Sequence, residues 1–308
     1  LNKVFSNIIF EESKKSIMAF NTKNEEETFL VKSNKEVVEL IKNNIINKDE
    51  INITIKNFKS LNLEFVFWNL LKFGIRLDHV KPNNLKLNKQ GFHEPESYTI
   101  YAKKLQDLPY KITLLIKACP QESNTLYQQV KHILKQMLSP NTFYEKVIAI
   151  DKKENDFLRQ YSGGNLEELY SVIEKLIDEG LIDYYIELPD DEIENVNYRW
   201  FGLKTKETHS IKNIPVAPQL YAFEVVKGDY ILQMDSDVMI GRADYHHSFL
   251  SDMIKALEEN KNATSVGFNI PKNKDITFVK YHAPKGEYKP EVRFALIHKR
   301  RFLDSRPW

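Results

Sequence analysis

Two aspartates one residue apart, Asp235 and Asp237, follow an apolar run from Tyr230 to Met234. Such a run is typical of a buried strand, where a carboxylate needs a compensating charge. Residues i and i+2 of a strand point to the same side, so both carboxylates can face one ligand, with the small Ser236 between them. Hard cations prefer carboxylate oxygens, and a cation here would keep positions open for the phosphates of a nucleotide. The sequence therefore predicts a site for Mn²⁺ or Mg²⁺ at Asp235 and Asp237.

The composition is that of a globular protein without a strongly charged surface. The chain has 308 residues, with 44 basic and 43 acidic side chains, so we expect no nucleic-acid partner. Cys119 is the one cysteine, which excludes an intrachain disulfide and favours a reducing, cytoplasmic location. The most apolar stretch, Phe65 to Leu71, is too short to be a transmembrane segment. Because the sequence begins at Leu1 and ends abruptly, we expect it to be a piece of a longer protein.

A turn-rich stretch at residues 81–108 divides the chain, and we expect it to be a linker. Residues 1–80 are predicted to form a small α+β domain. Its expected strands are at 4–10, 16–20 and 28–31, and its helices at 37–45 and 61–73. This order faintly resembles that of winged-helix peptide-binding modules, but a purely structural cap is the favoured interpretation.

Residues 109–308 alternate strand and helix patterns. Strands are expected at 112–116, 147–150, 182–188, 230–234 and 264–270, and helices at 125–138, 166–177, 216–226 and 248–259. This alternation predicts an α/β fold with a mostly parallel sheet and helices on both faces. Ligands of such sheets bind beyond the carboxyl ends of the strands. Three polar groups fall there: the segment 118–122, Asp151, and the pair Asp235 and Asp237.

In the order and spacing of these motifs, residues 110–308 resemble a GT-A fold glycosyltransferase of the family 2 type. An apolar strand leads into a donor-binding loop at 112–119, a second strand ends in the acidic Asp151, and Gly228 precedes the strand with Asp-x-Asp. Lys212-Asn213 stands where the family has Arg-Asn, which keeps the charge but loses the bidentate fork for phosphate.

The resemblance implies roles for individual residues. Asp237 would bind the metal, Asp235 the metal or the ribose, and Asp151 an N–H of the nucleotide base. His282 and His298 are candidates for a third metal ligand. The family's catalytic base usually lies farther along than this chain extends, so we expect the GT-A domain to be truncated; Glu291 and Asp304 are the late carboxylates that could replace that base. The residues expected to bind the nucleotide sugar are Ala118, Pro120, Glu122, Asp151, Lys212, Asn213, Asp235 and Ser236.

The predicted function is metal-dependent, hexosyltransferase-type transfer of a sugar from a nucleotide-sugar donor, with UDP expected as the nucleotide. The resemblance implies inversion at the anomeric carbon and a saccharide or lipid-linked glycan as acceptor, whereas a winged-helix-like first domain would favour a peptide. Two alternatives are nucleotidyl transfer on a related fold and a non-catalytic nucleotide-binding module. Against nucleotidyl transfer, no glycine-rich basic loop follows the first strand at 112–116.

Overall fold

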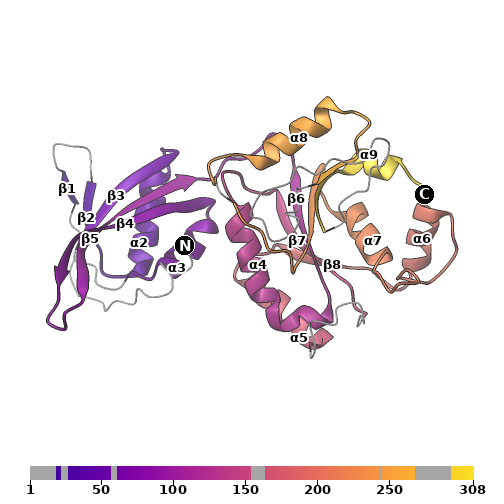
Figure 1. The fold of residues 1–308 in the computed structure, drawn as a ribbon, viewed down its shortest axis with the longest axis horizontal. Helices are drawn as coiled ribbons and strands as arrows, with labels where there is room; N and C mark the ends of the chain where they lie inside the picture. The colour runs from indigo at the N-terminus through magenta and orange to yellow at the C-terminus, as the bar shows by residue number, and fades with distance from the viewer. Residues whose placement is uncertain (1–18, 22–26, 57–60, 154–163, 243, 268–292) are drawn as a thin grey trace, which may run out of the picture. The chain divides into compact units, whose positions relative to one another are not determined.

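The computed structural model of the chain describes residues 19–21, 27–56, 61–153, 164–242, 244–267 and 293–308 (Figure 1). The chain divides into two compact units, Leu1–Gln106 and Asp107–Trp308. The first has a five-stranded sheet and the second a six-stranded sheet. None of the helices in the described ranges is both long enough and apolar enough to cross a lipid bilayer.

The first unit is an α+β arrangement in which strands and helices alternate. Its sheet has the order β1-β2-β3-β5-β4, in which β2 and β3 are parallel and the other neighbours antiparallel. The Ser33 side chain caps the first helix by accepting from the backbone N–H of Glu36. The elements are β1 (Ala19–Asn21), β2 (Glu27–Leu30), α2 (Asn34–Ile45), β3 (Glu50–Lys56), α3 (Leu63–Leu71), β4 (Ile75–Leu87) and β5 (His93–Lys104).

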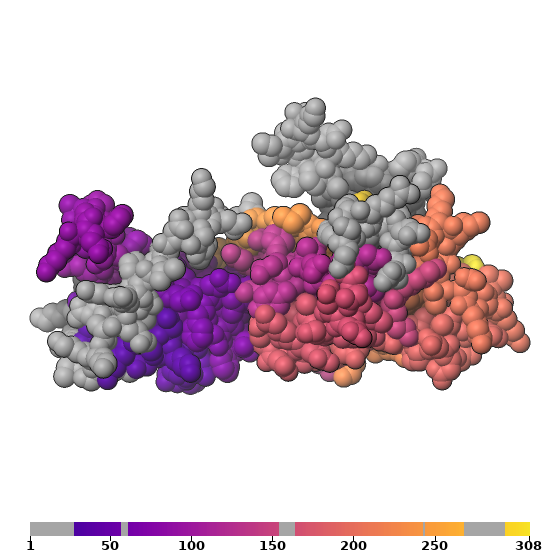
Figure 2. Space-filling model, turned by 90° about the horizontal axis from the view of Figure 1, so that it is seen from below, coloured from indigo at the N-terminus to yellow at the C-terminus, as the bar shows by residue number. Residues whose placement is uncertain are grey.

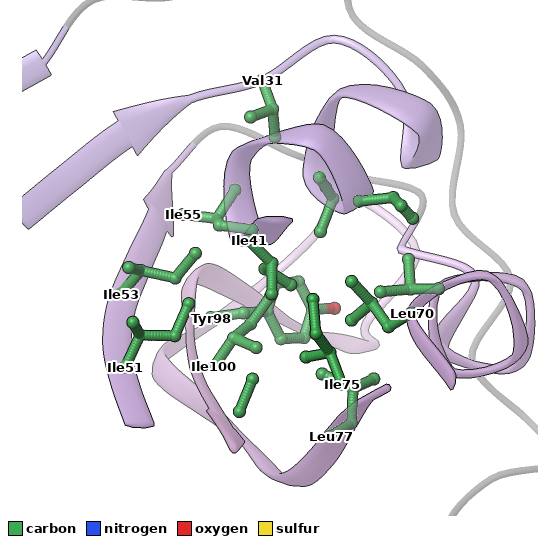
Figure 3. Close-up of a cluster of buried hydrophobic side chains, with 14 of the residues drawn as sticks. Val31, Ile41, Ile51, Ile53, Ile55, Leu70, Ile75, Leu77, Tyr98 and Ile100 are labelled. Carbon is green, nitrogen blue, oxygen red and sulfur yellow. The ribbon is translucent and has the colours of Figure 1, made fainter. Parts of the chain in front are cut away.

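Branched aliphatic side chains from these strands and helices form the core of the first unit. Figure 3 shows Ile51, Ile53 and Ile55 of β3 directed toward Ile41 of α2 and Ile100 of β5, all of them buried. The resemblance to a winged-helix module stays a prediction. It rested on three strands followed by helices, whereas the described unit alternates the two. The predicted strand 4–10 and most of 16–20 lie outside the described residues.

The predicted linker at 81–108 is wrong, because most of it belongs to the β4–β5 hairpin of the first unit. The turn-like residues 81–84 misled the prediction: β4 is an edge strand, where Pro82 removes no needed ladder hydrogen bond. The hairpin tip is exposed, with Leu85, Leu87 and Phe92 at 56, 66 and 68%. Figure 2 shows it in purple as a projection of this unit.

The second unit has the predicted α/β fold class, a mostly parallel sheet covered by helices on both faces (Figure 1). The sheet order is β10-β11-β9-β6-β7-β8, in which β9, β6, β7 and β8 are parallel and β11 runs antiparallel to β9. The strands are β6 (Ile112–Ala118), β7 (Glu145–Ile150), β8 (Tyr184–Glu187), β9 (Tyr230–Asp235), β10 (Ser265–Gly267) and β11 (Phe294–His298).

The alternation of side chains along the strands explains the two layers of helices. Leu115, Val147 and Ile231 share one buried cluster with α6, α7 and α9, so their sequence neighbours face α4 and α5 on the other side. The segment 189–215 contains α6, a helix that was not predicted from the sequence. The helices are η1 (Pro120–Glu122), α4 (Ser123–Met137), α5 (Leu166–Asp178), α6 (Ile193–Phe201), α7 (Ala217–Val225), α8 (Phe249–Glu259) and α9 (Lys299–Asp304).

A polar cluster fixes the amino ends of the three central strands. The buried Glu145 carboxylate accepts the Thr113 hydroxyl at 2.6 Å and the Lys227 backbone N–H at 2.6 Å. Gly228 donates its N–H to the Thr113 hydroxyl, and a Cβ at this position would lie 2.5 Å from that oxygen. Only glycine lets β9 start this close to β6, and the register that results sets where Asp235 emerges.

Candidate functional site

Asp235 is the last residue of β9, and the strand pairing places it beside Lys117 of β6. The Lys117 ammonium lies 2.7 Å from Asp235 Oδ1. The backbone N–H of Asp235 donates to the carbonyl of Arg293, and that of Ser236 to the carbonyl of Lys117. The carboxylate is therefore held at the junction of β6, β9 and the residue preceding β11.

Asp237 lies in the turn after β9, two residues beyond the end of the strand at Asp235, so the strand alternation assumed from the sequence does not extend to it. Burial, and then the charge of Asp235, raise the pKa of Asp237, while Arg293 and Lys117 oppose the rise. Two carboxylates that repel each other beside cationic side chains are suited to a bound cation or to the phosphates that accompany one.

Glu122 connects the end of β6 to the turn that carries the aspartates. Its carboxylate accepts the backbone N–H of Cys119 at 2.9 Å and the hydroxyl of Ser236. The residue is 4% exposed, and burial raises the pKa of its carboxyl to about 7. Glu122 and Ser236, both expected to contact the nucleotide sugar, therefore contact each other and hold the predicted donor loop against the Asp-x-Asp turn.

The raised pKa of Glu122 makes stability depend on pH. The folded state keeps the proton up to about pH 7, whereas the unfolded chain releases it near 4.5, so the free energy of unfolding falls as pH rises between these values. This shift of the Glu122 pKa corresponds to a loss in the free energy of unfolding on the order of 3 kcal/mol. We expect Glu122→Gln, which keeps the shape but not the charge, to remove this part of the slope. Urea unfolding of both proteins between pH 5 and 8 measures it; parallel curves would contradict the assignment.

The other two residues of the predicted donor loop lie at the carboxyl end of β6. Ala118 is buried, and its carbonyl accepts the backbone N–H of Asp151 at 2.9 Å, which joins the ends of β6 and β7. The Pro120 carbonyl is covered by Gly164, where a Cβ would lie 2.2 Å away. The Cys119 thiol between them is buried, which raises its pKa, so it is no nucleophile.

Asp151 lies at the carboxyl end of β7 and lines a pocket. The pocket has a volume of about 260 Å³, below the roughly 300 Å³ at which pockets for drug-sized ligands begin, so it suits one part of a larger ligand. Apolar walls and charged side chains surround it: Ile150, Asp151, Lys152, Lys153, Leu188, Asp190, Ile193, Thr208 and Pro218.

His209, the hydrogen-bond partner of Asp151, was not predicted from the sequence. The His209 Nε2 atom lies 2.8 Å from Asp151 Oδ2, and its Nδ1 atom lies 2.8 Å from the Thr208 hydroxyl. His209 is 58 residues from Asp151 in the sequence, and no motif marked it. Lys212 and Asn213 lie at the tip of the same loop, where Asn213 has a φ of 57° and Lys212 is exposed. Neither residue lines the pocket.

Two sequence predictions about supporting residues are wrong. His298 pairs with Tyr230 at the amino end of β9, because β11 runs antiparallel; five residue spacings, roughly 16 Å, separate it from Asp235 along the strand. Asp304 ends α9, which starts directly after β11 at that same edge, so it is not placed to act as a base near Asp237. His282 and Glu291 lie outside the described residues.

The carboxylates at the end of β9 fit a divalent cation in part. Asp237, half-buried and repelled by Asp235, supplies the oxygen chemistry that Mn²⁺ or Mg²⁺ needs. Asp235 already has Lys117 as a counter-charge. In the part of the chain that the structure describes, no three Asp, Glu, His or Cys side chains gather as a complete metal site. A cation held here would need further oxygen ligands, such as the phosphates of a nucleotide.

The sequence matches no protein-family profile and no curated protein. Three solved structures are similar to this chain. S. aureus TarS is 16% identical over 48% of this chain, with a TM-score of 0.27, and the galactosyltransferase LgtC, in complex with donor and acceptor sugar analogues, is 12% identical over 63% of it, with a TM-score of 0.34. Mannosyl-3-phosphoglycerate synthase from Rubrobacter xylanophilus is 11% identical over 51% of this chain, with a TM-score of 0.29. All three of these proteins are glycosyltransferases. The chain spans 20, 60 and 38% of the lengths of these proteins, and the likeness concerns the fold alone.

Proposed function

We propose that the second unit belongs to a metal-dependent glycosyltransferase that transfers a sugar from a UDP-sugar with inversion. One observation carries the proposal: the ends of the parallel strands β6, β7 and β9 bring a carboxylate pair with nearby cations, and the pocket that Asp151 lines, to one edge of the sheet. The pocket suits the base of a nucleotide, and the carboxylate pair suits a cation with a diphosphate.

The chain's own residues have separate parts in this proposal. Asp237, with Asp235, would hold Mn²⁺ or Mg²⁺, which when bound neutralises charge on a diphosphate leaving group. Lys117 and Arg293 bring positive charge to the same place, since both oppose the rise in the pKa of Asp237. Glu122 positions the donor loop, and Asp151 accepts an N–H of the base. The proposed location stays cytoplasmic, with a saccharide, lipid-linked glycan or peptide as acceptor.

The base that activates the acceptor is the open part of the mechanism. Single displacement at a sugar carbon needs a carboxylate within hydrogen-bond reach of the acceptor hydroxyl. Asp304 is excluded by its position, which leaves Glu291 of the two carboxylates considered. Because Asp304 does not lie near Asp237, a second candidate function is also favoured, a nucleotide-binding module without catalysis.

Donor hydrolysis separates these two functions. We expect the protein to release UDP slowly from UDP-glucose, UDP-galactose or UDP-N-acetylglucosamine in the presence of Mn²⁺, because water can replace the acceptor. Release is measured by chromatography of the nucleotides, with Asp237→Asn as the inactive control. Manganese-dependent UDP binding without any release would support the non-catalytic module and contradict the enzymatic proposal.

A further inference from the structure

A buried histidine, His209, contacts Asp151, the acidic residue at the end of β7 that lines the pocket. The His209 side chain is 2% exposed and does not line the pocket, whereas the Asp151 side chain is 10% exposed and does. With the Thr208 hydroxyl donating to Nδ1, the Nε2–H of a neutral imidazole donates to Asp151 Oδ2. The chain Thr208–His209–Asp151 thus fixes both the ring and the carboxylate.

The loop that carries His209 is itself anchored. The Nδ2 amide of Asn197, a buried residue of α6, donates to the carbonyls of Thr205 and Glu207 at 2.8 and 2.9 Å. The backbone N–H groups of Val216 and Ala217 both donate to the carbonyl of Thr208. Because the residues directly before His209 are held by Asn197 and by the start of α7, the imidazole is a rigid support for Asp151 rather than a surface side chain that happens to meet it.

The hydrogen bonds of Asp151 restrict what its carboxylate can offer a ligand. Oδ2 accepts from His209, and Oδ1 accepts the backbone N–H of Lys153 at 3.2 Å. A carboxylate has about four acceptor positions, of which two are thus used. Each oxygen therefore keeps one acceptor position, on a side chain of which only 10% is exposed.

One of the two lysines that line the pocket is already engaged by acidic side chains. Lys152 lies 3.0 Å from Glu187 and 3.1 Å from Asp190, so its charge is already paired. The apolar walls from Ile150, Leu188 and Pro218 instead suit a flat, neutral ring. The ligand part that fits is a base with a hydrogen-bond donor on its edge.

We infer that His209 is a positioning residue that sets the base specificity of the pocket: by holding Oδ2 it fixes the direction in which Asp151 presents its remaining acceptor positions, and this orientation selects uracil. Uracil presents a single ring N–H between two carbonyls. Guanine presents two adjacent N–H donors and pairs best with both carboxylate oxygens, and the ring nitrogen of cytosine is an acceptor that a carboxylate repels. The inference rests on the proposed function, because it assumes that a nucleotide base occupies the pocket.

The test is calorimetric titration of UDP, GDP and CDP, each with Mn²⁺, into wild type and variants. We expect wild type to prefer UDP over GDP by about tenfold or more, the value of a hydrogen bond to a charged group. His209→Phe should weaken UDP binding about tenfold and bring the UDP-to-GDP ratio near one, whereas His209→Gln, which keeps a side-chain donor, should retain most of the preference. His247→Phe is the matched control, since His247 forms the same 2.8 Å contact with the exposed Asp252.

The possible outcomes distinguish the role of His209 from the proposed function on which it rests. A wild type that binds UDP, with a His209→Phe variant that keeps its UDP-to-GDP ratio, would overturn the role of His209 and leave the proposed function standing. A folded wild type that binds no nucleotide would overturn both. If His209→Phe does not fold, Thr208→Val takes its place, because it frees the imidazole without removing it; an unchanged ratio in that variant would equally overturn the inference.

Discussion

Replacing Asp237 by Asn is expected to abolish the manganese-dependent part of UDP binding. The carboxylate is half-buried and repelled by Asp235, so a divalent cation relieves a cost that the amide does not have. Even residues outside the ligand shell of a metal change its affinity about 10- to 100-fold, and a direct ligand should matter at least as much. Calorimetry with and without Mn²⁺ gives the two affinities.

Two controls make this result specific. Asp304→Asn removes a carboxylate at the opposite edge of the sheet and should bind UDP like wild type. In the absence of metal, Asp237→Asn should be at least as stable as wild type, because the substitution removes repulsion from Asp235. Equal, manganese-dependent binding of UDP by wild type and Asp237→Asn would rule out Asp237 as the metal ligand.

Replacing Trp200 by Ala is expected to produce the largest loss of stability in the second unit. Trp200 is fully buried on α6, with its ring centroid 5.5 Å from that of Phe302 and 5.3 Å from that of Trp308. The Arg306 guanidinium lies 5.1 Å from the ring. Removing a buried aromatic side chain costs about 3–5 kcal/mol, because the surrounding residues only partly fill the cavity.

Urea unfolding followed by circular dichroism measures this loss as a change in the free energy of unfolding. Tyr198 is the matched control, because it lies on the same helix and is 57% exposed. Tyr198→Ala should change the free energy by no more than about 0.5 kcal/mol. Similar losses in the two variants would contradict the placement of α6 against the sheet.

The parallel sheet and the position of Asp235 could be predicted from the sequence. Strands buried on both faces give continuous apolar runs, and 112–116 and 230–234 are runs of this kind. The direction of a strand, by contrast, cannot be predicted from such a pattern. Phe294–His298 runs antiparallel to β9, which takes His298 away from Asp235, and a sequence pattern of period two is the same in both directions.

The contacts that complete the candidate site could not be predicted, because they join side chains far apart in the sequence. His209 meets Asp151 only because α6 and the loop after it fold back over the end of β7. Glu122 was predicted as part of the donor loop, but its hydrogen bond to Ser236 joins it to the turn after β9, which is far away in the sequence. The hairpin at 75–104 was hidden by Pro82 and the neighbouring Asn residues, whose turn preference is outweighed by pairing with β5.

The most direct test of the central claim is calorimetric titration of UDP into the wild-type chain, with Mn²⁺ and with EDTA. We expect saturable binding with a stoichiometry near one that weakens strongly when the metal is removed, since the carboxylates at the end of β9 then repel the diphosphate. Absence of UDP binding by the folded protein in the presence of Mn²⁺ would contradict the assignment of this sheet edge as a nucleotide-sugar site.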